Sequence, residues 1–304
     1  MLALLLSSFL TFVQLNCENL FDCRHDEGKE DFEFLSDGAR HWSPTHYWKK
    51  LNMIGQEILS CSSSPPDLVA LCEVENDSVL HDLTRRSLLR NAGYHYLMTQ
   101  SPDVRGLDVA LLYQPHTFRP LCYDIITVAP LTGMRPTRDI LYVQGETITG
   151  DTLHIFVVHA PSRYAGELET RANRNHVATI LLQAVATVGS GMVLVTGDFN
   201  DYADSPSLLM LTGSGLRHLT ATAVGRHGAV HGTYNFHGRW QSLDHILATP
   251  TLADHADTAF VNDAPFLLVV DDTYGGWKPR RTFNGYRYLG GFSDHLPLVV
   301  RFRF

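Results

Sequence analysis

Short, largely apolar runs that begin or end at a polar residue recur along the chain. They occupy residues 10–15, 68–72, 109–113, 155–158, 192–195, 242–247 and 296–300. Runs of this length between turn residues are typical of strands, and those without alternation are typical of strands buried on both faces. We therefore predict a sheet protein whose strands deliver Asn, Asp, Glu and His side chains at their ends.

Helical signals fall in three segments. Ser43 and Pro44 supply an N-cap and a first-turn proline, and the helix that they begin ends before the Ser-Ser-Ser-Pro-Pro breaker at residues 62–66. A second helix is predicted over residues 78–89 and a third, the strongest, over residues 167–188. Spacing predicts that the third helix packs through one apolar face, made of Leu168, Ala172, Ile180, Leu181, Ala184 and Val188.

Strands and helices alternate to the C-terminus, with no linker, low-complexity tract or repeat. This predicts a single α/β domain over residues 1–304. Residues 1–10 have two readings, an incomplete signal peptide or the start of the first strand, because they are apolar but lack a basic start and an A-x-A-like cleavage site. The compartment, cytoplasmic or exported, stays open, and no stretch approaches the ~20 apolar residues of a membrane span.

Composition narrows the class of protein. With 44% hydrophobic and 18% charged residues in 304, the chain is predicted to be globular. Subtracting 32 acidic from 24 basic residues leaves a net charge of −8, so any phosphate chemistry needs local cations or a metal ion. The five cysteines form no C-x-x-C pair, which predicts mostly buried thiols rather than a disulfide framework.

Several strand ends carry candidate catalytic groups. Asp198 and Asn200 alternate in G-D-F-N-D, so an extended chain would point both side chains to one centre, although an Asx turn explains the same residues. Asp244-His245 and Asp294-His295 repeat an Asp-His pair, and an aspartate that accepts a hydrogen bond from a distant imidazole fixes its tautomer. A structural hydrogen bond is the alternative for each histidine.

Glu73 and His159 also end buried strands. A carboxylate there is costly unless it meets a cation. Because Glu73, Asp294, Asn16 and Asp198 offer only oxygen ligands, a bound metal is predicted to be Mg²⁺ or Mn²⁺ rather than zinc.

Taken in chain order, these motifs resemble the endonuclease/exonuclease/phosphatase superfamily, the deoxyribonuclease-like phosphodiesterases. The resemblance spans Asn16 to His295 and rests on L-N-C-E-N-L, L-C-E-V-E-N, V-H-A-P-S-R, G-D-F-N-D, S-L-D-H-I and F-S-D-H-L-P. It implies a four-layer α/β sandwich, in which two mixed β-sheets pack face to face with helices on the outside and the site lies at one end.

The resemblance also implies a role for each residue. Glu73 would bind the metal, with Asp294 and Asn16 as partners, and Asp198 would orient or deprotonate the attacking water. Asn200 and His159 would hold phosphate oxygens. His295, oriented by Asp244, would stabilise charge on the phosphoryl group or transfer a proton. Which group is the general base stays open.

Three arginines near predicted strand ends, Arg105, Arg138 and Arg163, are candidates to bind phosphate, and a salt bridge is the alternative expected for one of them. Residues 22–40 are acidic and irregular, which predicts a solvated loop beside the site. An acidic loop there argues against a long groove for duplex nucleic acid.

The sequence thus predicts a metal-dependent phosphodiesterase, nuclease-like, acting on nucleic acid or a small phosphodiester. A phosphomonoesterase acting on small, lipid or sugar phosphates is one alternative, and a degenerate member that binds phosphorylated ligands without turnover is another. A monomer without an obligate protein partner is expected. A zinc hydrolase is disfavoured, because the candidate metal ligands offer only oxygen atoms.

Overall fold

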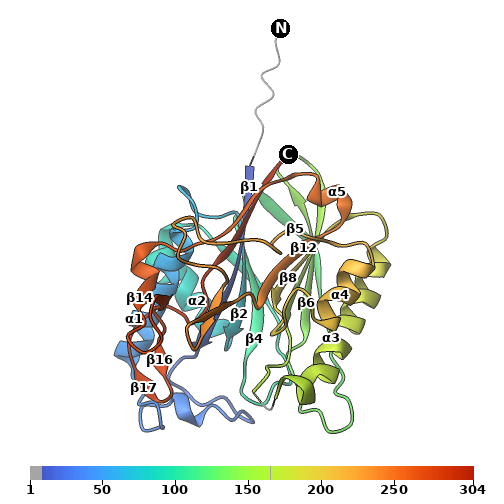
Figure 1. Cartoon of the computed structure of the whole chain (residues 1–304). Coiled ribbons are helices and arrows are strands. Elements are labelled where there is room, and N and C mark those ends of the chain that lie inside the picture. The colour runs from blue at the N-terminus through green and yellow to red at the C-terminus, as the bar shows by residue number, and fades with distance from the viewer. Residues whose placement is uncertain (1–8, 165) are drawn as a thin grey trace.

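Two six-stranded sheets form the centre of the molecule (Figure 1). The computed structural model describes residues 9–164 and 166–304. In order across the first sheet the strands are β13 (Ala256–Val261), β18 (Leu298–Arg303), β1 (Phe9–Leu20), β2 (Leu68–Val74), β4 (Asp108–Tyr113) and β3 (His95–Met98). The second sheet has the order β5 (Phe118–Ile126), β6 (Ile140–Thr147), β7 (Thr152–His159), β8 (Met192–Asp198), β12 (Asp244–Ala248) and β9 (Arg217–His218).

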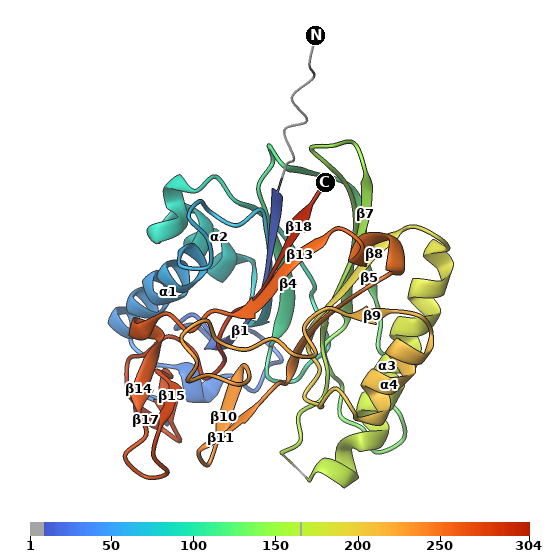
Figure 2. The same cartoon turned by 45° about the horizontal axis from the view of Figure 1, so that its top comes forward.

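Helices cover the outer faces of both sheets (Figures 1 and 2). On one side lie α1 (Pro44–Leu59) and α2 (Asp77–Arg85), and on the other lie α3 (Glu167–Val188) and α4 (Pro206–Gly213). Short elements are α5 (Pro250–Ala253), three 3₁₀ turns (Phe32–Phe34, Leu88–Asn91, Pro265–Leu267) and the hairpins β10–β11 (Tyr234–Phe236, Arg239–Gln241), β14–β15 (Leu268–Val270, Trp277–Pro279) and β16–β17 (Phe283–Asn284, Arg287–Tyr288). The predicted four-layer sandwich is confirmed.

Alternate residues of the central strands enter different cores. Phe12 packs between the sheets with Leu141 and Leu194, whereas the next residue, Val13, packs under α1 with Ile54. A third core joins the outer face of the second sheet to α3 and α4. The continuous apolar runs are therefore strands buried on both faces, as predicted.

The crossover connections place the strand ends together. β1 pairs parallel with β2, and β7 pairs parallel with β8; α1 lies in the first connection and α3 in the second. Because parallel neighbours end at the same edge of a sheet, all four strands deliver their last residues to the rim opposite the start of β1 (Figure 1). β12 runs antiparallel to β8 and begins at that rim.

The structure changes several predicted boundaries. β1 continues past Asn16 to Leu20, and the predicted helix over 78–89 is α2 followed by the 3₁₀ turn at Leu88–Asn91. Residues 1–8, on which the signal-peptide reading rests, lie outside the described residues. In the part of the chain that is described, no helix has the length and apolar character to cross a membrane.

The predicted apolar face of α3 is wrong at its start. Its buried residues are Arg174, Val177, Ala178 and Leu181, whereas Leu168 is 68% exposed and Ala172 is also exposed. Leu168 precedes Arg174 by six residues, which places it roughly 240° around the helix from that face. Arg174 can be buried because its guanidinium Nε lies 2.7 Å from an Asp201 carboxylate oxygen.

The other local predictions hold in outline. The Ser43 hydroxyl accepts a hydrogen bond from the His46 amide and caps α1. All five cysteines are free, and Cys17, Cys61 and Cys72 are buried. Residues 22–40 are irregular apart from one 3₁₀ turn but are only partly solvated, because Asp31 is buried against His25.

Candidate active site

Asp198 lies at the meeting point of the two sheets. It ends β8, and its Oδ2 accepts a 3.0 Å hydrogen bond from Nδ2 of Asn16 in β1. The same oxygen lies 3.7 Å from Nε2 of His159 and 3.9 Å from Nε2 of His295. Burial raises the pKa of Asp198 to about 7, although the positive charge of His295 opposes this shift. A carboxylate that exchanges a proton near neutrality thus sits among hydrogen-bonding partners.

Glu73 reaches the site from a bulge in β2. Its φ is +63°, and the register between β2 and β4 shifts between Cys72 and Val74. A bulge re-aims a side chain at the end of a strand. The Glu73 Oε2 accepts a 2.8 Å hydrogen bond from the Asn19 amide, and Oε1 lies 3.8 Å from Nε2 of His159.

The two site histidines have opposite electrostatics. Burial lowers the pKa of His295, but Asp244 and Asp198 outweigh burial, so that pKa lies well above its ordinary value. Burial and the charges of Arg138 and Arg105 hold the pKa of His159 well below its ordinary value. The structure therefore offers one imidazolium and one neutral imidazole at the same carboxylate.

His295 is held by Asp244. The imidazole Nδ1 lies 2.7 Å from Asp244 Oδ2, which also accepts a 2.6 Å hydrogen bond from the Thr233 hydroxyl. The Tyr234 ring lies 4.9 Å from the His295 ring. The hydrogen bond at Nδ1 leaves Nε2 facing Asp198, because the two nitrogens point to opposite sides of the ring.

At Asn200 the structure shows the Asx turn, and the prediction of an extended chain through G-D-F-N-D is wrong. The Asn200 backbone amide donates to Asp198 Oδ1 at 2.8 Å, which closes the turn, and the Asn200 φ is +51°. The Asn200 side chain donates to the Ala160 carbonyl at 3.1 Å, beside His159. Asn200 thus turns toward the end of β7 instead of extending parallel to Asp198.

Sequence reasoning missed two charged residues beside Asp294. Arg281 donates to Asp294 Oδ2 at 2.8 Å, and its Nε lies 3.4 Å from Glu18 Oε1. Glu18 also accepts hydrogen bonds from the amides of Thr282 and Phe283. Burial and the nearby Asp294 raise the pKa of Glu18 to about 7. Glu18 stands in L-N-C-E-N-L two residues after Asn16, so its position was visible, but Arg281 carried no local signal.

Comparison with known proteins identifies the family of the chain. A family model described as the endonuclease/exonuclease/phosphatase family matches residues 11–303. The chain belongs to this family. The superfamily consists mostly of hydrolytic enzymes that act on phosphoesters. No curated protein matches the chain.

Solved structures from this family share the fold. An endonuclease/exonuclease/phosphatase family protein from Bacteroides thetaiotaomicron has a TM-score of 0.67 and 18% identity, over 98% of each chain. A mannosyl-6-phosphatase from the same organism has a TM-score of 0.65 and 19% identity, over 96% of this chain and 98% of its own. The catalytic domain of human Nocturnin has a TM-score of 0.59 and 19% identity, over 97% of each.

Enzymes of this family generally use divalent metal ions. Among the described residues, one group of three acidic or imidazole side chains is close enough to share an ion: Asp198, Asp244 and His295. Asp244 is already hydrogen-bonded to His295 and Thr233, which makes this trio an acid–base network. Glu73 and Asp294 supply carboxylate oxygen, and each keeps one oxygen beyond its hydrogen bond or ion pair; that donor chemistry fits Mg²⁺ or Mn²⁺.

The three predicted arginines differ in their surroundings. Arg138 is buried, pairs with Asp103 at 3.2 Å and donates to the Ala160 carbonyl at 3.0 Å. Arg163 donates to Gln241 at 2.7 Å and lies over the Tyr202 ring. Arg105 is 43% exposed and meets Asp103 only at 3.9 Å. Arg105 therefore has the least committed charge of the three, and Arg138 the most.

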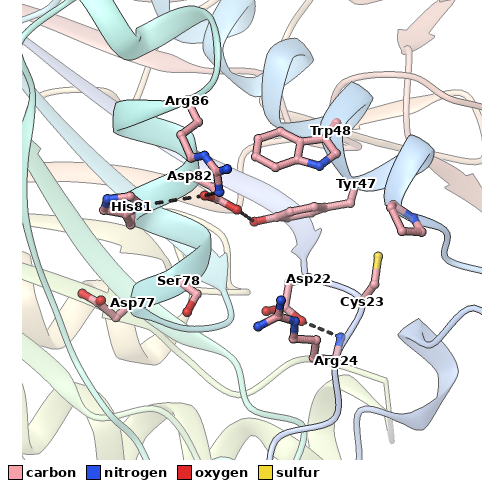
Figure 3. Close-up of a pocket in the computed structure, with 11 residues that line it drawn as sticks. Asp22, Cys23, Arg24, Tyr47, Trp48, Asp77, Ser78, His81, Asp82 and Arg86 are labelled. Atoms are coloured by element: carbon pink, nitrogen blue, oxygen red, sulfur yellow. Dashed lines mark hydrogen bonds and ion pairs between the residues drawn. The ribbon is translucent and has the colours of Figure 1, made fainter.

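A separate pocket of about 390 Å³ lies between α1 and α2 (Figure 3). Tyr47 donates to Asp82 at 3.0 Å across it, and Arg86 pairs with the same carboxylate. Asp22, Cys23 and Arg24 form the facing wall (Figure 3). All the predicted site residues lie outside its walls.

Proposed function

We propose that this protein is a metal-dependent hydrolase of phosphodiesters with nuclease-like activity. The observation that carries the proposal is the environment of Asp198, whose Oδ2 faces Asn16, His159 and His295 within 3.9 Å. Attack on a phosphodiester needs a positioned water, positive charge around the phosphoryl oxygens and a proton for the leaving group. The side chains around Asp198 meet each of these needs.

Asp198 is the group that we assign to the attacking water. Its pKa near 7 suits proton transfer at neutral pH, because a general base works best when its pKa is close to the operating pH. Asn16 fixes the orientation of the carboxylate through the 3.0 Å hydrogen bond. His295, held protonated by Asp244, would stabilise negative charge on the phosphoryl group and donate a proton from Nε2.

Glu73 and Asp294, together with Asn16, would hold the Mg²⁺ or Mn²⁺ ion. Such an ion neutralises charge on phosphate oxygens when it is bound. His159 is suited to bind a phosphate oxygen as a neutral donor, because its low pKa keeps the imidazole uncharged. Arg105, whose charge acts on His159 and which is only weakly paired with Asp103, would add positive charge.

A phosphomonoesterase is the second candidate, because one structural neighbour is named a mannosyl-6-phosphatase. A hydrolysis panel separates these functions. With Mg²⁺ present, we would measure plasmid DNA, single-stranded DNA, RNA, a bis-phenyl phosphodiester and several phosphomonoesters. Cleavage confined to phosphomonoesters would contradict the proposal, and absence of turnover with retained phosphate binding would indicate a degenerate member.

A further inference from the structure

A second pocket, of about 450 Å³, adjoins the candidate active site. Its inner wall contains Tyr234 and Arg281, which contact His295 and Asp294 respectively. Its outer wall comes from the β10–β11 and β14–β15 hairpins, which lie side by side at one end of the molecule (Figure 2). This volume is within the range of roughly 300–1,000 Å³ that is typical of small-molecule sites.

From the chemistry of these walls, we infer that the pocket binds one nucleotide unit of the substrate, a planar base with a phosphate group, next to the reacting phosphodiester. The inference rests on the proposed function, because the nucleotide unit would belong to a substrate that is cleaved at the neighbouring site. It adds a substrate class that the catalytic residues do not specify.

Aromatic side chains line the pocket. The rings of Phe236 and His237 stack at 4.0 Å, and those of His237 and Tyr274 stack at 5.0 Å. Phe236 and Tyr274 are 50% and 54% exposed, so their rings present a large apolar surface to solvent. Stacking of a base on such a ring is worth about 1–3 kcal/mol and does not depend on which base it is.

Contacts between the two hairpins hold the aromatic wall of the pocket in place. Gly238 has a φ of +76°, and a Cβ at this position would lie 2.6 Å from the Cβ of Tyr274. Asn235 fixes the turn by accepting from the Gly238 amide and reaches the Trp277 carbonyl on the other hairpin at 3.3 Å. Glycine therefore permits the close contact that holds Tyr274 against the β10–β11 turn.

The charges of the pocket favour an anionic ligand. Lys278 is neutralised by Asp271 at 3.0 Å, and Arg281 is neutralised by Asp294 and Glu18. Arg280 is exposed and makes no ion pair within the described chain. A guanidinium without a carboxylate partner is suited to bidentate binding of a phosphate.

The test compares three phosphodiesters: the 5′-phosphorylated dinucleotide pApA, its unphosphorylated form ApA, and glycerophosphoethanolamine, which has no ring. Wild-type protein should prefer pApA. We expect Arg280→Ala to lower the ratio of kcat/KM for pApA to that for ApA about tenfold, the effect of one lost charge-assisted hydrogen bond. Tyr274→Ala should lower the ratio for ApA over glycerophosphoethanolamine about tenfold.

Two matched variants serve as controls. Arg287→Ala removes an exposed arginine, and Phe32→Ala an exposed aromatic ring, and both residues lie outside the pocket. Neither ratio should change in them. A short single-stranded DNA is assayed beside pApA, to distinguish a polymer from a free nucleotide as the source of the bound unit. The inference is supported if the protein prefers either substrate and Arg280→Ala removes that preference.

Calorimetric titration with adenosine 5′-monophosphate separates this inference from the proposed function. We expect Arg280→Ala to raise the Kd about tenfold and Arg287→Ala to leave it unchanged. If wild-type protein hydrolyses none of the diesters but binds the nucleotide through Arg280, the proposed function fails and the pocket assignment stands. If it hydrolyses all three equally and binds no nucleotide, the pocket assignment is overturned.

Discussion

The Nδ1 atom of His295 lies 2.7 Å from Oδ2 of Asp244, although 51 residues separate them in the chain. Asp244 begins β12 of one sheet, and His295 lies just before β18 of the other. The contact therefore joins the two sheets at the rim where Asp198 lies. It also keeps the imidazole Nε2 directed toward the Asp198 carboxylate.

Because the pair acts as one unit, removing either member should remove most of its effect. We expect His295→Ala and Asp244→Asn each to lower kcat by about 10²-fold or more, and the double variant to be hardly worse than the worse single one. Steady-state kinetics and melting temperatures of all three variants check this. His245→Gln serves as the control. It changes the histidine that follows Asp244 in the sequence, whose ring hydrogen-bonds to His218 and to the Asp201 carbonyl. If the losses in kcat of the two single variants add up in the double variant and parallel the losses in melting temperature, the pair has a structural role.

Metal removal should abolish hydrolysis. We expect EDTA to inactivate the protein, Mg²⁺ or Mn²⁺ to restore it, and Glu73→Gln to raise the Mg²⁺ concentration for half-maximal activity about tenfold, because a neutral amide is a weaker ligand than a carboxylate. Glu75→Gln is a matched control two residues away, since Glu75 bonds instead to the Asp22 amide. Full activity in excess chelator would refute this expectation.

The arginines should separate into two kinds. We expect Arg105→Ala to lower kcat/KM about tenfold with little change in melting temperature, because its charge is mostly uncommitted. Arg138→Met should instead cost about 3 kcal/mol or more of stability, because it strands the buried Asp103 carboxylate. Kinetics and chemical denaturation measure the two effects. Equal destabilisation by both substitutions would show that Arg105 is structural.

Glu75 should make stability depend on pH. Burial raises its pKa to about 9, so the folded state holds the proton more tightly than the unfolded state. Its contribution is complete below the unfolded pKa near 4.5 and is lost as the pH rises toward 9. Glu75→Gln, which cannot ionise, should leave the melting temperature unchanged at pH 4 and raise it by about 2–5 °C at pH 8.

Glu27→Gln is the control for this pH dependence, because Glu27 is exposed in the neighbouring acidic loop. Thermal melts at pH 4, 6 and 8 compare both variants with the unsubstituted protein. An identical pH dependence of the Glu75→Gln variant and the unsubstituted protein would show that Glu75 ionises without cost.

Local pattern was sufficient for the central strands and the motifs at their ends. The runs at 68–72 and 192–195 are strands, and Glu73 and Asp198 follow them at the site rim, because apolar length and turn residues act between near neighbours. Local pattern did not predict which residues form hydrogen bonds across the fold. Arg281 and Glu18 are 263 residues apart, and no pattern between neighbours could join them.

The sequence alone therefore determined where strands run and which polar groups end them, since backbone geometry and burial depend on adjacent residues. Tertiary structure decided which of those groups meet. It separated buried Arg138 from exposed Arg105, paired Asp244 with His295, and placed Arg280, which has no ion pair within the described residues, in the same pocket wall as Tyr274. The physical reason is that charge pairing and solvent exposure depend on distances in space, which only the packing of both sheets establishes.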